Sequence, residues 1–102
     1  MRVIIFFDLP TGTPVERKAY MQFRKYLLNA GYDMLQYSVY VRITGSRDDA
    51  QHMLGIVKRH LPSKGQVRAL MVTEKQYAAM QILLGKPTIA EKETSCQEML
   101  VL

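Results

Sequence analysis

One carboxylate, Asp8, stands where it could do chemistry, because it ends an unbroken apolar run from Val3 to Phe7. A run this short and this rich in β-forming residues predicts a strand buried on both faces. The turn Leu9-Pro10-Thr11-Gly12 follows at once. Asp8 is therefore expected at the tip of a central strand, where a charge is costly unless something pairs with it. Two interpretations stay open: an aspartate that accepts backbone N–H bonds and starts the turn, or a ligand for magnesium or manganese, which suit carboxylate oxygens.

No other hydrolytic constellation is visible in the sequence. It contains neither a Ser/His/Asp nor a Cys/His arrangement, and no Gly-rich phosphate loop. One carboxylate per chain is a poor metal site, whereas two from a symmetric dimer are better, although they repel each other unless a cation or a proton lies between them. An enzymatic interpretation thus depends on Asp8 as catalytic residue and metal ligand, with magnesium or manganese as cofactor. Its phosphate-binding candidates are Arg17, Arg24 and Arg42.

Basic residues repeat along the first predicted helix. Arg17 and Arg24 are seven residues apart, as are Lys18 and Lys25, so two helical turns bring each pair nearly into line. The result is a ridge of four charges opposite the core, which is either a solvated helix face or a surface for phosphate contact. The net charge of +5 and the pI of about 9.5 favour a polyanionic partner weakly.

Capping patterns divide the chain into elements. Thr13, Pro14 and Glu16 form a capping box with proline at the first helical position, and predict a helix to about Asn29 with Gly31 beyond its end. The segment from 32 to 42 is rich in β-branched and aromatic residues, and its alternation fits one long strand or a tight hairpin equally well.

The second half of the chain continues the alternation of helix and strand. Ser46 caps a helix whose predicted buried stripe includes Leu61, and Pro62 stops it. Residues 66–73 alternate as a strand, and residues 73–76 repeat the capping-box pattern of a short helical turn.

This order predicts an α+β fold, the ferredoxin-like β-α-β-β-α-β arrangement with a C-terminal strand extension. We expect a ferredoxin-like domain over residues 1–85 and a linker with a C-terminal strand over residues 86–102. Two helices would cover one sheet face, and the other face needs a cover that a homodimer supplies. The apolar end Met99 to Leu102 reads as a strand, in residues 97–102, that docks on the partner subunit.

The sequence gives no sign of export or membrane insertion. No apolar run approaches the roughly 20 residues that span a bilayer, and the N-terminus lacks the features of a signal peptide. The single cysteine, Cys96, excludes an intramolecular disulfide and gives no metal-site spacing. A cytoplasmic protein with no membrane partner is therefore expected.

Three segments resemble one known family. The run Val3 to Pro10, with Asp8 ending the first strand, is similar to the opening of the CRISPR-associated protein 2 family, the small partner of the CRISPR spacer-acquisition integrase. Gln36-Tyr37-Ser38-Val39-Tyr40 resembles that family's Gln-x-Ser-Val-aromatic strand, and Thr73 to Tyr77, followed by Met80 and Ile82 to Gly85, resembles the branch of type II systems. The resemblance covers nearly the whole chain.

The resemblance implies a ferredoxin-like homodimer in which two strand-end aspartates, at the position of Asp8, face each other and hold a divalent metal. Family members are described as metal-dependent endonucleases acting on RNA or DNA. They also bridge two integrase dimers and hold the duplex DNA to be inserted. Nucleic-acid contacts are expected at Arg17, Lys18, Arg24, Lys25 and Arg42.

Two functions of different class therefore remain. One is a CRISPR adaptation subunit that binds double-stranded DNA and bridges integrase dimers, with or without metal-dependent phosphodiester hydrolysis. The other is a stand-alone metal-dependent endoribonuclease acting on single-stranded RNA, including a toxin of related fold. Basic helix charges outnumber plausible catalytic groups, which favours the first.

Overall fold

The computed structural model describes residues 1–88. Its contacts divide the chain into two compact units, Met1–Met71 and Val72–Leu102, and each is described by itself. The first unit holds the sheet and both long helices, with β4 ending at its border. In chain order these elements are β1 (Arg2–Asp8), α1 (Pro14–Asn29), β2 (Asp33–Gln36), β3 (Val39–Ile43), α2 (Arg47–Lys58) and β4 (Gln66–Val72).

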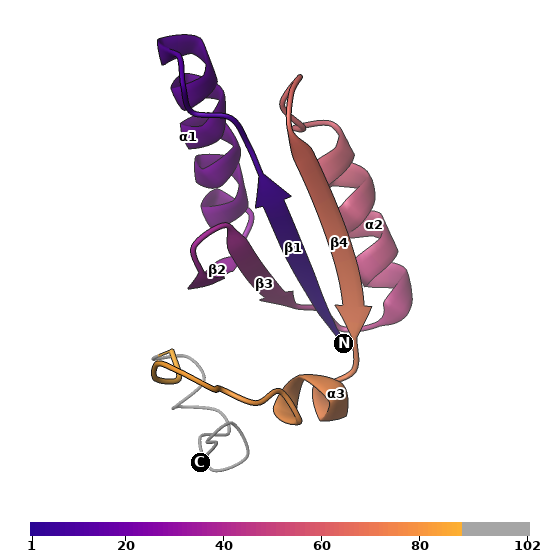
Figure 1. Cartoon of the computed structure of the whole chain (residues 1–102). Coiled ribbons are helices and arrows are strands. Elements are labelled where there is room, and N and C mark those ends of the chain that lie inside the picture. Colours follow the sequence, from indigo (N-terminus) through magenta and orange to yellow (C-terminus); the bar gives the residue numbers. More distant parts are fainter. Residues whose placement is uncertain (89–102) are drawn as a thin grey trace. The chain divides into compact units, whose positions relative to one another are not determined.

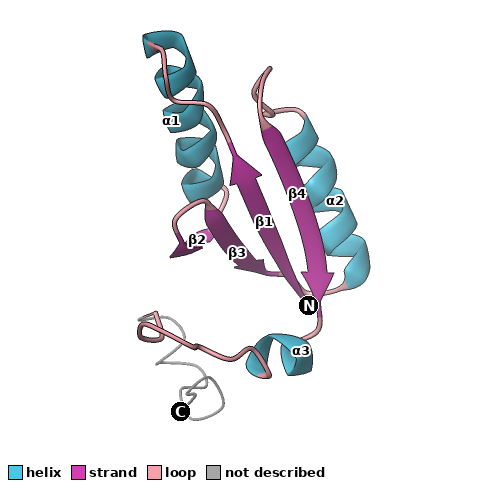
Figure 2. Ribbon diagram, viewed as in Figure 1, coloured by secondary structure: helices cyan, strands magenta, loops and turns pink. Residues whose placement is uncertain are grey.

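The four strands form one antiparallel sheet in the order β2-β3-β1-β4 (Figure 1). β1 pairs with β3 from Arg2↔Ile43 to Phe6↔Val39. On its other side β1 lies next to β4, which runs in the opposite direction (Figure 2). The predicted α+β class and the element order β-α-β-β-α-β are confirmed.

Both long helices pack on one face of the sheet. Side chains alternate between the two faces of a strand, and Val3, Ile5 and Phe7 share the core with α1 and α2. Phe7 is central, because its ring packs edge-on against Phe23 at 5.3 Å and against Tyr20 at 5.8 Å. The prediction that β1 is buried on both faces is only partly right, since Phe6 on the opposite face is 39% exposed.

The segment from 32 to 42 forms a hairpin, which resolves the alternative that the sequence left open. Tyr37 and Ser38 make a two-residue turn between β2 and β3, and Ser38 adopts φ 62° without being glycine. The segment that resembles a family strand therefore contains this turn. A register shift between Met34 and Gln36 interrupts the simple alternation in β2. Tyr37, in the turn, is 87% exposed, whereas Tyr40, opposite Ile5 on β3, is buried in the core.

Capping sequences locate the helix ends. In α1 the Thr13 side chain accepts from the Glu16 N–H while Glu16 accepts from the Thr13 N–H, which confirms the predicted capping box. At the other end the Tyr32 N–H donates to the Leu27 carbonyl and the Gly31 N–H to that of Leu28, with Gly31 at φ 90°. This is a Schellman motif, in which glycine supplies the left-handed residue.

The second long helix starts at its predicted cap but ends before the predicted residue. Ser46 caps α2 by accepting from the Asp49 N–H, as predicted. The prediction that Leu61 is buried on this helix is wrong: α2 ends at Lys58, and Leu61 lies beyond it with 45% of its side chain exposed.

The second unit begins with a short helix, α3 (Glu74–Ala78), where Thr73 and Gln76 form the predicted capping box. The domain boundary expected at residues 85 and 86 stays a prediction. The C-terminal strand expected in residues 97–102 lies outside the described residues. Within residues 1–88, no helix is long and apolar enough to cross a membrane.

Candidate functional site

Asp8 is the last residue of β1, and its side chain is exposed. It belongs to the series Ile4, Phe6, Asp8, whose members point away from α1 and α2 by the alternation of strand side chains. The last β1–β3 residue pair is Phe6↔Val39, and the Phe7 N–H then donates to the Ser38 carbonyl at 3.0 Å. Asp8 therefore lies just past the end of the β1–β3 ladder, with its carboxylate in solvent.

The sheet face that carries Asp8, called here the Asp8 face, also carries several large apolar side chains. Register and alternation assign it the apolar side chains of Ile4, Phe6, Val39, Val41, Ile43 and Leu70, and, besides Asp8, the polar side chains of Arg2, Asp33, Gln66 and Arg68. Ile4 and Val41 are buried, whereas Phe6, Ile43 and Leu70 are 39%, 56% and 52% exposed. A carboxylate therefore stands at the end of a surface on which large apolar side chains meet water.

The described residues of one chain supply too few ligands to enclose a metal ion. Among residues 1–88, no three His, Cys, Asp or Glu side chains gather within reach of one cation. Magnesium nevertheless binds through only one or two carboxylates, keeping waters and taking substrate phosphate oxygens as further ligands. The exposed Asp8 carboxylate fits such a site as half of a pair, and a second copy of the chain would supply the other half.

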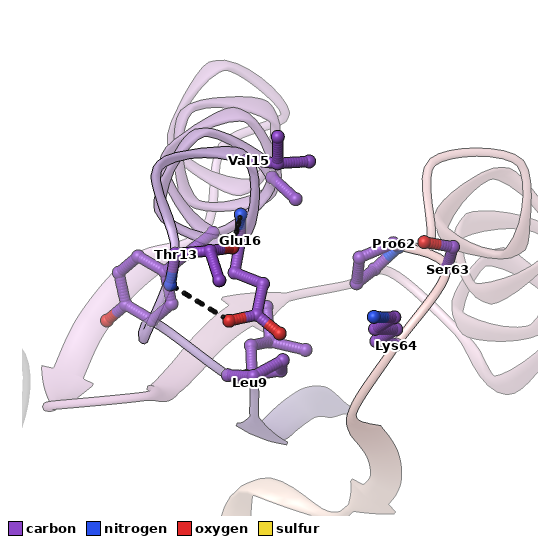
Figure 3. Close-up of a pocket in the computed structure, with 10 residues that line it drawn as sticks. Leu9, Thr13, Val15, Glu16, Pro62, Ser63 and Lys64 are labelled. Carbon is purple, nitrogen blue, oxygen red and sulfur yellow. Dashed lines mark hydrogen bonds between the residues drawn. The ribbon is translucent and has the colours of Figure 1, made fainter.

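A small cavity of about 160 Å³ lies beyond the end of β1, on the helix side (Figure 3). Leu9 forms part of its wall, α1 contributes Val15 and Glu16, and the loop after α2 contributes Pro62 to Lys64. Because Leu9 belongs to the core cluster, this cavity and the Asp8 carboxylate lie on opposite sides of the sheet. The cavity is not part of the Asp8 site.

The predicted basic ridge lies on the outward side of α1. Lys18, Arg24 and Lys25 line a shallow groove together with Met21, Gln22, Leu28 and Asn29. Both lysines are exposed, whereas Arg24 is half-buried. Arg17 is exposed, and its guanidinium donates to the Thr11 carbonyl at 3.1 Å, which ties it to the loop between β1 and α1. The four residues thus share one helix, as expected, with Arg17 at its start.

Arg42 lies apart from this ridge. It is on β3, opposite Val3 and therefore on the helix side of the sheet. Its guanidinium donates to the Ala30 carbonyl at 2.6 Å, which satisfies a carbonyl at the C-terminal end of α1. The structure gives Arg42 this structural contact, and its contact with nucleic acid stays a prediction.

An aromatic cluster near the same end of α1 was missed at the sequence level. The rings of Tyr26 and His60 stack at 3.8 Å with 9° between their planes. Burial raises the pKa of Tyr26, against the effect of the Arg42 and Arg59 charges. Burial likewise raises the pKa of Tyr32, whose buried hydroxyl has no hydrogen-bond partner in the described part of the chain. No sequence pattern predicts the stack of Tyr26 on His60, because it joins α1 to a residue beyond α2.

The fold and the site together place the chain in a class of small α+β proteins, which have a split β-α-β sheet and one exposed carboxylate at the end of the first strand. The chain belongs to the Cas2 family, because the family model described as CRISPR associated protein Cas2 matches residues 1–80.

Individual relatives agree over nearly the whole chain. The chain is 48% identical over 99 residues to the CRISPR-associated endoribonuclease Cas2 of Acidovorax ebreus (strain TPSY), covering 97% of each protein. It is 47% identical over 102 residues to the CRISPR-associated endoribonuclease Cas2 of Ligilactobacillus salivarius (strain UCC118), covering 100% of each. The crystal structure of Streptococcus pyogenes Cas2 at pH 6.5 shares the fold, with a TM-score of 0.62 at 18% identity over 81% of this chain and 99% of that one.

Proposed function

We propose that this protein is a homodimeric subunit of CRISPR adaptation, of the type II branch, that binds double-stranded DNA and bridges integrase dimers. Two surfaces on opposite sides of one chain support this function. The Asp8 face suits contact with a second copy, and the outward side of α1 suits contact with phosphates. In a dimer built on the Asp8 faces, each copy would keep its basic helix exposed for DNA.

The large apolar side chains of the Asp8 face support the homodimer. Phe6, Ile43 and Leu70 would leave water on association, and burial of apolar surface is worth about 25 cal/mol per Å². A two-fold axis near the end of β1 would bring the two Asp8 carboxylates close together. They would repel each other unless a cation or a proton lay between them, so this contact would create a site for Mg²⁺ or Mn²⁺.

We further propose that this paired site hydrolyses phosphodiesters when a divalent metal is bound. The metal would supply charge stabilisation at phosphorus and an activated water. Asp8 would hold it, and the basic side chains of α1 would hold substrate phosphates. The relatives' description as endoribonucleases supports a second function, a stand-alone endoribonuclease acting on single-stranded RNA, including a toxin of related fold. Both functions belong in the cytoplasm, where nucleic acids and an integrase subunit would be met.

The single observation that carries the enzymatic part is the exposed Asp8 carboxylate at the end of β1. Asp8→Asn should abolish Mn²⁺-dependent hydrolysis of RNA and DNA while leaving affinity for duplex DNA within twofold of the wild type. Asp48→Asn is a matched control, since Asp48 is also an exposed aspartate but lies in the first turn of α2, on the other side of the sheet, and it should keep full activity.

Each outcome of this comparison supports or contradicts one part of the proposed function. Loss of hydrolysis in Asp8→Asn alone supports the metal-dependent site. Hydrolysis by both variants at the wild-type rate would show that the activity comes from elsewhere or from a contaminant, and the adaptor function would then stand alone. Loss of duplex binding in Asp8→Asn would contradict the assignment of DNA contact to α1.

A further inference from the structure

The loop between α2 and β4 comes very close to the end of β1 at Gly65. A Cβ atom built on Gly65 would lie 2.6 Å from the Asp8 carbonyl oxygen, 2.7 Å from Leu9 Cδ2 and 3.1 Å from Leu9 Cα. Two of these three atoms are backbone, so no rotation of a side chain relieves them. Gly65 also adopts φ +99°, a conformation that other L residues adopt at a cost.

This close approach matters because Asp8 lies beyond the point where β1 is paired with β3. The β1–β3 residue pairs end at Phe6↔Val39, two residues before Asp8. On the opposite side β4 begins at Gln66, directly after Gly65. Gly65, which comes close to the Asp8 carbonyl, therefore lies on the side where β1 still has a neighbouring strand.

Leu9 anchors the same junction from the helix side. It is 8% exposed and belongs to the core cluster. Figure 3 shows Leu9 between the start of α1 and the loop that carries Pro62, Ser63 and Lys64. The chain turns from Asp8 into a buried residue that Gly65 of this loop approaches closely, so a displaced loop is expected to move both residues together.

We propose that Gly65 is a positioning residue for Asp8: the absence of a side chain at 65 allows the loop to fix the Asp8 backbone, and hence the carboxylate, at the end of β1. The proposal rests on the proposed function of Asp8 in metal binding and hydrolysis. Any side chain at 65 would have to shift the Asp8 backbone or the loop by a few tenths of an ångström at least. In a homodimer with paired Asp8 residues, both halves of the site would shift.

The test compares three glycine variants. Gly65→Ala introduces both the Cβ contact and the backbone strain. Gly65→Asn introduces the same Cβ, but asparagine tolerates positive φ. Gly85→Ala introduces the strain alone, because Gly85 has φ +105° and nothing within 4 Å of a built Cβ. Circular dichroism and sedimentation velocity establish that each variant is folded and retains the wild-type association state.

The expected result is a loss at residue 65 only. Because misplacement by about 1 Å costs on the order of 100-fold in rate, kcat for Mn²⁺-dependent hydrolysis should fall on the order of 10-fold or more in Gly65→Ala and Gly65→Asn. KM should stay within twofold, since the basic surface of α1 is untouched. The increase in Tm caused by Mn²⁺, a readout independent of turnover, should shrink in both variants and stay at the wild-type value in Gly85→Ala.

Other results would overturn the proposal. Folded Gly65→Ala with kcat and Mn²⁺ response within twofold of wild type would show that Asp8 does not depend on this contact. A defect in Gly65→Ala that is absent from Gly65→Asn would assign the effect to backbone strain instead. If Asp8→Asn matches the wild type in both kcat and Mn²⁺ response, the proposed function fails and the role of Gly65 fails with it. If Asp8→Asn is defective while both Gly65 variants match the wild type, only the role of Gly65 is refuted.

If Gly65→Ala does not fold, a variant with a longer loop tests the proposal instead. One glycine inserted between Ser63 and Lys64 loosens the loop without adding a Cβ, and surface loops tolerate such insertions. The same loss of kcat and of Mn²⁺ response is expected. Wild-type values in a folded insertion variant would overturn the proposal.

Discussion

At the residue scale, the Tyr32 hydroxyl is a destabilising group. It is buried without a hydrogen-bond partner among the described residues, and an unsatisfied buried donor costs about 1–3 kcal/mol. Tyr32→Phe removes the hydroxyl and keeps the ring, so it should increase the free energy of unfolding by about 1 kcal/mol. Chemical denaturation measures this change. Tyr37→Phe is the control and should be neutral, because Tyr37 is 87% exposed; a destabilised Tyr32→Phe would indicate a bound water or another partner.

Alkaline pH provides a second test at this scale. Burial raises the pKa of Tyr32 and of Tyr26 in the folded state above the ordinary value of 10.0. The folded state therefore holds these protons more tightly than the unfolded state. Their contribution to stability is complete below pH 10 and is lost as the pH rises through the higher folded-state values. Denaturation curves between pH 8 and 12 should show this loss, and Tyr32→Phe should reduce it; an equal loss in wild type and variant would contradict the assignment to Tyr32.

At the element scale, the basic side of α1 should control the salt dependence of DNA binding. Each phosphate contact contributes about −0.9 to the slope of log affinity against log salt for B-DNA. Lys18 and Lys25 are exposed and line one groove. The double variant Lys18→Gln/Lys25→Gln should therefore flatten this slope by roughly 2 or more per dimer, if both copies contact DNA. Fluorescence anisotropy at several salt concentrations measures it.

The control for that experiment lies on the other helix. Lys58 is an exposed lysine in the last turn of α2, so Lys58→Gln removes a comparable charge from outside the ridge. Its slope should equal that of the wild type. An unchanged slope in the double variant would mean that the α1 ridge is merely a solvated helix face.

Local signals explain why the helices were predictable. The Thr13–Glu16 box, the Ser46 cap and the Thr73–Gln76 box each involve residues three apart, so the sequence pattern contains the whole interaction. The β2–β3 hairpin could not be predicted with equal certainty. Its turn at Tyr37 and Ser38 contains no glycine or asparagine, and pairing with β1, distant in the sequence, holds β3 in place.

The candidate site likewise has a part that the sequence predicts and a part that it does not. Asp8 was identifiable because it ends an apolar run, and the helical spacing of the α1 charges can be counted. The contact of Gly65 with the Asp8 carbonyl is a non-local approach between two backbones, and no spacing rule describes it. The carbonyl contact of Arg42 was missed for the same reason, because it joins β3 to the C-terminal end of α1.

At the scale of the whole molecule, the Asp8 face should mediate dimerisation. Leu70 is 52% exposed on that face, and Leu61 is 45% exposed elsewhere. Leu70→Glu would place a charge against apolar surface in the dimer, so it should raise the dimer Kd at least about 10-fold, or 1.4 kcal/mol. Leu61→Glu should leave the Kd unchanged. Sedimentation velocity over a concentration series measures both, and a Kd that Leu70→Glu does not change would exclude this face from the dimer.

The central claim is that Asp8 holds a divalent metal in the assembled protein, and thermal melts with and without Mn²⁺ test it most directly. Metal that binds only the folded state raises Tm. The wild type should therefore gain Tm with Mn²⁺, and Asp8→Asn should lose that gain while melting no lower than the wild type without metal, since the substitution relieves repulsion between the paired carboxylates. If Mn²⁺ raises the Tm of Asp8→Asn as much as that of the wild type, Asp8 is not the ligand.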